Sequence, residues 1–296
     1  MRIKVFEDIS PTNGQFDAPA EHGLAGFTVL INDIVGQVST DVFGNPLCTQ
    51  YDADGNPLGQ TNCLVSDANG DIVVPNLGPN RYDVNMTAPS GETWVQTTTL
   101  EGSHSWDTWL QEGGTGLDNE FVNAGEPFPW TVFGFVRPTD LLNDPQVTGG
   151  VSGVVVSASV YVPWGGGGLP YYGGQWGGLS GAKLTGPVSD AWVALSDLQN
   201  GDTAVYVGPV DQNGAFNIQN VPDGNYLFTY WDYRQHYILD WMQVVVSDGQ
   251  VTDLGTPFLT GWFTWVEGYV FEDTNSNGKR DPGERGIPDY LIVLKD

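Results

Sequence analysis

The chain has 296 residues, of which 36 are acidic and 10 are basic, so its formal net charge is −26. A field this negative repels nucleic acid and anionic membrane, and we expect neither nucleic-acid binding nor membrane insertion of this segment. Because hydrophobic residues still make up 40% of the chain, beside 40 Gly and 19 Pro, the composition indicates short strands and tight turns rather than a disordered acidic tail.

The N-terminal segment enters a predicted strand at once and recurs much later in the chain. Val5-Phe6-Glu7-Asp8 returns letter for letter at Val270–Asp273, and the apolar run 27–31 returns at 290–294. Within each copy, polar residues lie between these two runs, and those of the first copy, such as Asp17, have counterparts in the later copy. We therefore interpret the two stretches as the starts of two related domains.

The two cysteines, Cys48 and Cys63, flank the turn sequence Asp52-Ala-Asp-Gly-Asn-Pro57. A hairpin at this turn would bring the cysteines together, and a disulfide closing about 15 residues would stabilise the fold by roughly 3 kcal/mol. Two free thiols are the alternative. The spacing fits neither a C-x-x-C redox site nor a zinc site.

An Asn-Gly turn signal occurs twice with the same surroundings. Asn69-Gly70 leads to Tyr82, and Asn213-Gly214 leads to Tyr226 at identical spacing. Asn-Gly favours a hairpin because both residues tolerate positive φ. The alternation that follows each turn predicts inward-facing side chains at Ile72, Val74, Phe216 and Ile218.

The segment 163–179 consists mainly of glycine and aromatic residues. Trp164, Tyr171, Tyr172 and Trp176 would form a contact surface for a glycan or another protein chain if they are exposed. The alternative is that they fold back over a neighbouring strand of their own domain.

The stretch 273–284 fills every place of the D-x-[DN]-x-[DN]-G-x5-E calcium loop. The side chains of Asp273, Asn275, Asn277, Asp281 and Glu284 supply oxygens, and Lys279 offers its carbonyl. Aromatic and β-branched residues precede the loop, and Pro282 and Pro288 exclude the following helix that an EF-hand requires. The sequence therefore predicts a calcium loop between two strands.

In the first copy, Asp8, Asn13, Asp17 and Glu21 take the corresponding places. This loop is two residues longer, one before Asn13 and one before Glu21, so either Ser10 or Thr12 has to replace the regular third position.

The later loop resembles the SdrD B-like repeats of bacterial surface proteins. The resemblance rests on Val270–Asp273, the Asn-x-Asn-Gly core, Asp281-x-Gly-Glu284 and Gly286-Ile287-Pro288. It implies an immunoglobulin-like, calcium-binding β-sandwich that serves as a stalk or spacer outside the cell. Residues 188–260 resemble carboxypeptidase regulatory-like domains, which implies a transthyretin-like sandwich without catalytic residues.

Together these patterns predict an all-β chain of tandem immunoglobulin-like or transthyretin-like β-sandwich domains. We expect a first SdrD B-like domain over 1–130, a carboxypeptidase regulatory-like domain over 131–262, and the start of a further SdrD B-like domain over 263–296. The last stretch is too short to bury a core alone. We expect it to be completed either by further chain or by strands of a second molecule.

No catalytic motif is present in the sequence: none of the three histidines has a metalloprotease spacing, and neither G-x-S-x-G nor a phosphate loop occurs. We therefore expect an extracellular structural or adhesive array stiffened by Ca²⁺, rather than an enzyme. Its expected partners are neighbouring repeats of the same or an identical chain, with glycans or other surface proteins as further candidates. A carbohydrate-binding module and the accessory domains of a secreted hydrolase are the alternatives.

Overall fold

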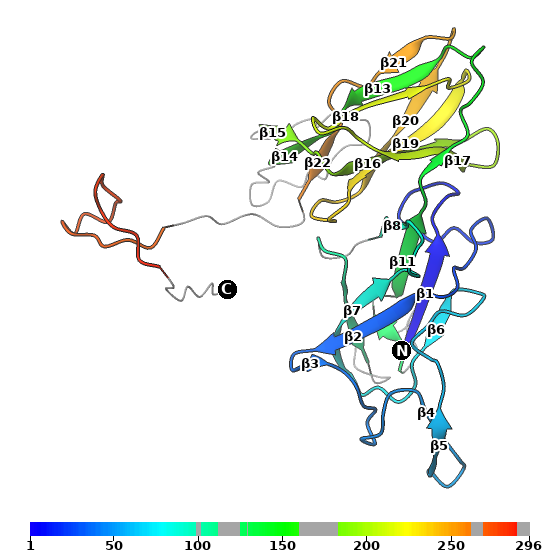
Figure 1. The fold of residues 1–296 in the computed structure, drawn as a ribbon, viewed down its shortest axis with the longest axis vertical. Helices are drawn as coiled ribbons and strands as arrows, with labels where there is room; N and C mark the ends of the chain where they lie inside the picture. The colour runs from blue at the N-terminus through cyan, green and yellow to red at the C-terminus, as the bar shows by residue number, and fades with distance from the viewer. Residues whose placement is uncertain (99–101, 112–124, 129, 160–182, 262–268, 289–296) are drawn as a thin grey trace. The chain divides into compact units, whose positions relative to one another are not determined.

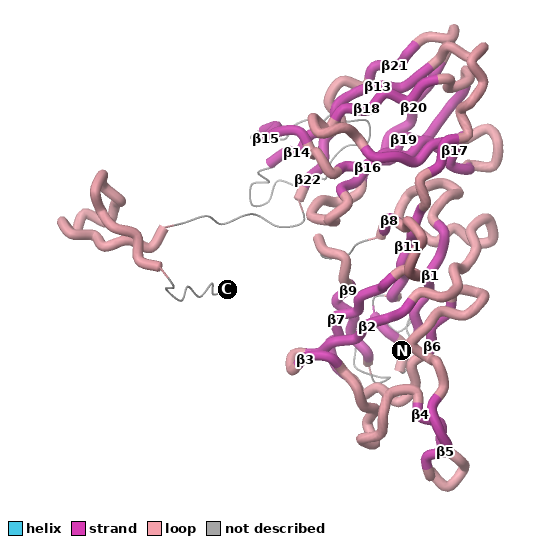
Figure 2. The backbone as a smooth tube through the Cα atoms, in the orientation of Figure 1, coloured by secondary structure: helices cyan, strands magenta, loops and turns pink. Residues whose placement is uncertain are grey.

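In the computed structural model, the residues described are 1–98, 102–111, 125–128, 130–159, 183–261 and 269–288, and among them every regular element is a strand (Figures 1 and 2). The all-β prediction is therefore confirmed. The chain divides into two units, Met1–Trp262 and Phe263–Asp296. The described residues contain no helix long and apolar enough to cross a membrane.

The first sandwich packs a four-stranded sheet on a five-stranded sheet, with a separate hairpin of two strands. The four-stranded sheet has the order β6 (Asp71–Val73), β1 (Arg2–Glu7), β11 (Thr131–Val136) and β8 (Val95–Gln96). The five-stranded sheet has the order β10 (Pro127–Phe128), β9 (Trp106–Leu110), β7 (Asn80–Thr87), β2 (Thr28–Asp33) and β3 (Gly36–Gln37). The hairpin consists of β4 (Thr49–Tyr51) and β5 (Pro57–Gln60).

β11 belongs to this first sandwich, whereas the sequence placed a domain boundary at residue 130. β11 runs parallel to β1, with Ile3 opposite Thr131 and Glu7 opposite Phe135. Phe133 and Phe135 of β11 are buried in the core of the first sandwich. The first sandwich therefore ends at Val136, because β11 supplies one of its central strands.

The predicted disulfide is confirmed. Cys48 and Cys63 are bonded, with their Cα atoms 5.5 Å apart, and β4 and β5 form the predicted hairpin between them. Cys48 is buried in the sandwich core and Cys63 packs against that core, so the bond closes the base of the hairpin where the hairpin meets the body of the domain.

The second sandwich faces two three-stranded sheets with one five-stranded sheet. The five-stranded sheet has the order β12 (Thr139–Asp140), β17 (Thr203–Pro209), β16 (Ala191–Asp197), β19 (Gly224–Asp232) and β20 (Asp240–Val246). The three-stranded sheets have the orders β18 (Ala215–Gln219), β13 (Gly150–Val154), β21 (Val251–Asp253), and β15 (Lys183–Pro187), β14 (Val156–Ser159), β22 (Phe258–Thr260).

The two sandwiches share one build. β1 lies between antiparallel β6 and parallel β11, just as β13 lies between antiparallel β18 and parallel β21. The side chains predicted to face inward are all buried: Ile72, Val74, Phe216 and Ile218. The repeat noted in the sequence is therefore a repeat of structure.

The backbone geometry of the two Asn-Gly turns explains why each of them needs its glycine. Gly70 and Gly214 have φ of 78° and 74°, which glycine adopts without strain. A Cβ at Gly70 would lie 2.0 Å from the Val5 carbonyl oxygen, and one at Gly214 would lie 2.6 Å from that of Val155. Val5 and Val155 also hydrogen-bond to these glycines in the same way. Val5 N donates to Gly70 O and Val155 N donates to Gly214 O, both at 2.8 Å.

A third apolar cluster joins the two sandwiches. Val95 and Val136 of the first sandwich pack against four buried residues on the outer face of the second sandwich's five-stranded sheet, namely Ala194, Ala204, Val207 and Trp231. Gln235 Nε2 also donates to the Gln96 carbonyl at 2.5 Å. The two sandwiches therefore meet in a packed interface, which we call the junction.

The second unit is described over residues 269–288. Phe271 bridges to Gly286 as Phe6 bridges to Gly23, and Ile287 N donates to Val270 O as Leu24 N donates to Val5 O. This unit therefore begins as the first sandwich does. The strands predicted to flank its loop lie largely outside the described residues.

Candidate calcium loops

The first loop follows β1 and closes on itself through its own carboxylates. Asp8 accepts hydrogen bonds from the backbone N–H groups of Asn13 (2.9 Å) and Gly14 (2.8 Å). Glu21 reaches back across the loop, where Oε1 accepts from Ile9 N at 2.8 Å and Oε2 accepts from Asp17 N at 2.9 Å. The structure thus brings together the four residues that the sequence selected.

The loop of the second unit repeats these bonds position by position. Asp273 accepts from Asn277 N at 3.1 Å and Gly278 N at 2.7 Å, and Glu284 accepts from Thr274 N at 3.0 Å and Asp281 N at 2.9 Å. The equivalence extends to the side-chain amides. Asn13 Nδ2 donates to Asp17 and Asn277 Nδ2 donates to Asp281, both at 2.7 Å.

Two further predicted residues take their places in the second loop. Asn275 Nδ2 also donates to Asp281 at 2.7 Å, and Lys279 N donates to Asn277 Oδ1 at 2.7 Å. All six selected residues of this loop therefore lie around one turn of chain. What they bind stays a prediction.

The loops differ in their surroundings. Asp8 is fully buried and Glu21 is 4% exposed, whereas most of the second loop is exposed and only Glu284 is buried. Burial, followed by the neighbouring Glu21 carboxylate, raises the pKa of Asp8 to about 7. Burial likewise raises the pKa of Glu21 to about 7. Each buried anion is therefore costly unless a cation lies beside it.

Two buried hydroxyls, one in the first loop and one close to Asp8, lack hydrogen-bond partners in the described part of the chain. Within the described part of the chain, Thr12 Oγ1 is buried without a hydrogen-bond partner. Thr97 Oγ1 lies close enough to Asp8 to lower its pKa, yet it makes no hydrogen bond of good geometry. The sequence offered no signal for Thr97, because that residue stands 89 positions after Asp8 and no local pattern links them.

The donor set at both loops fits a hard divalent cation. Carboxylate, amide and hydroxyl oxygens are the ligands that Ca²⁺ prefers. In the described residues no Lys, Arg or His lies within ion-pair distance of Asp8, Asp17 or Glu21. No group of three or more His, Cys, Asp or Glu among those residues is arranged as a metal site. Amide, hydroxyl and backbone oxygens would therefore have to complete any coordination sphere.

The aromatic residues proposed as a contact surface, Trp164, Tyr171, Tyr172 and Trp176, lie outside the described residues. The strands on either side are described: β14 and β15 pair antiparallel, with Ser159 opposite Lys183. Val188 N donates to Val155 O as Leu24 N donates to Val5 O. In chain order, the aromatic segment thus stands where the first sandwich has its acidic loop.

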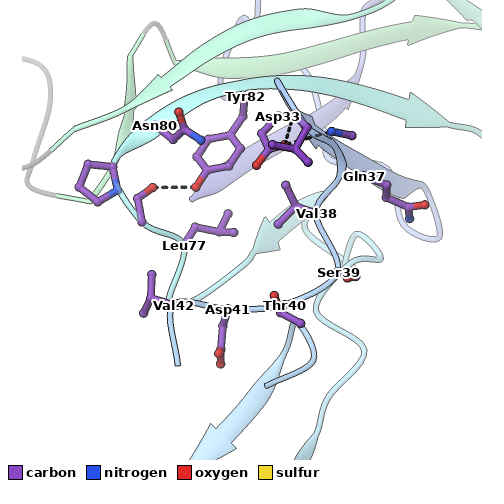
Figure 3. Close-up of a pocket in the computed structure, with 14 residues that line it drawn as sticks. Asp33, Gln37, Val38, Ser39, Thr40, Asp41, Val42, Leu77, Asn80 and Tyr82 are labelled. Atoms are coloured by element: carbon purple, nitrogen blue, oxygen red, sulfur yellow. Dashed lines mark hydrogen bonds between the residues drawn. The ribbon is translucent and has the colours of Figure 1, made fainter. Parts of the chain in front are cut away.

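A pocket of about 420 Å³ opens between residues 33–42, which include β3, and residues 77–82, which lead into β7 (Figure 3). Tyr82 lines it, but its hydroxyl donates to the Gly78 carbonyl at 2.7 Å. Burial, and secondarily Asp33, raises the pKa of Tyr82 above its usual range. This hydroxyl fixes the chain in a tyrosine corner.

Comparisons with known proteins give short or distant likenesses. No family model matches the chain. A stretch of 31 residues is 58% identical to Colossin-B of Dictyostelium discoideum and covers 10% of this chain but 1% of that protein.

Among solved structures, the minor pilin GBS52 of Streptococcus agalactiae aligns with 90% of this chain and 98% of its own at 11% identity, with a TM-score of 0.28. The Bacillus anthracis TIE protein aligns with 88% of this chain and 34% of its own at 11% identity, with a TM-score of 0.25. Both TM-scores are too low to support a shared function.

Proposed function

We propose that this chain is part of an extracellular array of β-sandwiches that is stiffened by calcium, as in a surface stalk or a filament. The observation that carries the proposal is a loop that occurs twice with the same hydrogen bonds, at the start of the first sandwich and at the start of the second unit. Between these two loops in the sequence lies a second sandwich of the same build. Repeated modules that begin with the same acidic loop are typical of a protein that acts as a spacer.

Calcium would be held in the first loop by Asp8, Asn13, Asp17 and Glu21, and in the second by Asp273, Asn275, Asn277, Asp281 and Glu284 with the Lys279 carbonyl. The ion would supply positive charge between carboxylates that repel one another, and so link loop order to folding. The disulfide between Cys48 and Cys63 supports an oxidising, extracellular setting.

The partners that we propose are neighbouring modules of the same or an identical chain. The junction is one such contact within the chain, and it buries Ala194 and Trp231. Glycans and other surface proteins remain proposals for the aromatic segment.

Calorimetric titration with CaCl₂ tests the proposal. We expect two ions per chain, and one ion after either Glu21→Gln or Glu284→Gln, because each change removes the carboxylate that spans its loop. Asp54→Asn, on the exposed hairpin turn, is the matched control and should leave two ions. Absence of calcium uptake by the unaltered chain would refute calcium stiffening.

Chelation gives a second readout. If calcium binds only the folded state, EDTA should lower the melting temperature of the unaltered chain. The double variant Glu21→Gln/Glu284→Gln should melt at the same temperature with and without EDTA.

A further inference from the structure

The second sandwich holds the first loop at Thr12. Thr12 N donates to Ser196 Oγ at 3.3 Å, and the Thr12 carbonyl accepts from Thr229 Oγ1 at 2.5 Å. Ser196, Thr229 and Thr12 are all fully buried. The next contact along the loop is similar, because Ala204 N donates to Ile9 O at 2.8 Å. Residues 184 to 217 positions away thus set the backbone of a loop in the first sandwich.

The residues held in this way include one of the two places at which the first loop is longer than the second. The first loop has four residues between Asp8 and Asn13, whereas the second has three between Asp273 and Asn277. In the second loop Asn275 occupies the third position and is exposed. In the first loop the candidates for that position are Ser10 and Thr12. Ser10 Oγ contacts Thr203 Oγ1 across the junction at 3.4 Å, which leaves Thr12 Oγ1 as the unpartnered oxygen.

We infer that the first calcium loop and the junction form one coupled site. Thr12 supplies the hydroxyl oxygen that replaces the third-position ligand, and the second sandwich orients it through Ser196 and Thr229. This inference rests on the proposed calcium binding. Since coupling between two binding events is reciprocal, calcium strengthens the docking of the second sandwich, and docking raises the affinity of the first loop for calcium.

Thr229→Val tests the coupling without touching a ligand. Valine keeps the volume of the side chain and removes the donor to the Thr12 carbonyl. In a Glu284→Gln background, where calorimetry reports the first loop alone, we expect calcium affinity to fall about tenfold, as for other residues that orient metal ligands. Ser196→Ala should act in the same direction, and Thr12→Val should lower the affinity at least as much.

The matched control is Thr252→Val, which removes a hydroxyl of the second sandwich away from the junction, where Thr252 Oγ1 donates to Val245 O at 2.9 Å. It should leave calcium affinity unchanged. Hydrogen exchange gives an independent readout. Calcium should slow the exchange of the Ala204 amide in the unaltered chain, and this protection should shrink in Thr229→Val.

The outcomes separate the two proposals. Failure of the unaltered chain to take up calcium defeats the proposed function, and this inference with it. If the first loop binds calcium but Thr12→Val leaves the affinity unchanged, or Ser196→Ala and Thr229→Val both do, the coupling is wrong while calcium binding stands.

Discussion

At the scale of single residues, two tyrosines show how the same solution is used twice. The Tyr82 hydroxyl donates to Gly78 O at 2.7 Å, and the Tyr226 hydroxyl donates to Pro222 O at 2.9 Å, in both cases four residues upstream. Burial, followed by Asp197, raises the pKa of Tyr226 to about 12, so the proton that makes this bond stays in place at neutral pH. Each tyrosine thus ties a turn to the strand that follows it.

Replacing these tyrosines should cost one hydrogen bond each. Tyr82→Phe and Tyr226→Phe should each lower the free energy of unfolding by about 1 kcal/mol, since the carbonyl loses its donor while the ring stays buried. Urea denaturation measures this change. Tyr233→Phe, at a half-exposed tyrosine, is the control and should change the free energy by far less. Equal effects at all three sites would contradict the role given to the corner bonds.

At the scale of elements, the hairpin β4–β5 is short and depends on its covalent bond. Its two strands form a sheet of their own, and all four residues of β5 are exposed. A two-stranded hairpin is marginal in water without further support. The disulfide supplies this support by closing a loop with a sequence separation of 15.

Removing the disulfide should lower the stability of the first sandwich. The double variant Cys48→Ala/Cys63→Ala should lower the free energy of unfolding by about 3 kcal/mol, because the unfolded chain regains the entropy of the open loop. Urea denaturation with intrinsic fluorescence measures the change. A reducing agent should destabilise the unaltered chain to a similar extent and leave the variant unaffected.

The elements that the sequence predicted are those coded by neighbours along the chain. The Asn-Gly turns, the inward positions Ile72 and Phe216, and the disulfide all depend on contacts or patterns within about 20 residues. The acidic loops are similarly local, which is why their residues come together as selected. Alternation and turn chemistry are legible in a single sequence because they arise from local backbone geometry.

The parallel pairing of β11 with β1 was not predicted, so the sequence ended the first domain at residue 130, just before β11 begins. More than 120 residues separate the two strands, and a strand carries no mark of which distant edge it will join. The same holds for Thr12 and Thr229. Such contacts depend on the shape and packing of whole sheets. The alternation of apolar and polar residues along a strand does not reveal them.

At the scale of the whole first unit, the junction packs the two sandwiches together into one compact unit. Ala194 is fully buried in the junction, on the outer face of its own sheet. Leu30 takes the same place in the first sandwich, as the strand pairing shows. Ile31 pairs with Val84 and Leu195 pairs with Phe228, and both Val84 and Phe228 stand two residues after the corner tyrosine. Leu30 and Ala194 are the residues just before Ile31 and Leu195. Leu30, however, is 39% exposed.

Ala194→Arg should therefore separate the sandwiches, because a charged side chain has no room or partner in the apolar junction. We expect calorimetry to resolve two melting transitions in place of one, and protease to cut between residues 137 and 149. Leu30→Arg makes the same chemical change at the equivalent, exposed position and should leave the melting profile unchanged. A single transition in Ala194→Arg would mean that the junction contributes little to cooperativity.

The parallel alignment of β1 with β11 has a mechanical consequence. A pull along the chain enters the first sandwich at the start of β1 and leaves it at the end of β11, so the two strands are drawn past each other lengthwise. Every hydrogen bond between Ile3–Glu7 and Thr131–Phe135 is then loaded in shear at the same moment, instead of being opened one after another. The second sandwich repeats the arrangement with β13 beside β21 and with β14 beside β22, the strand at which the chain leaves it. Tension would therefore meet its greatest resistance in these parallel pairs of strands.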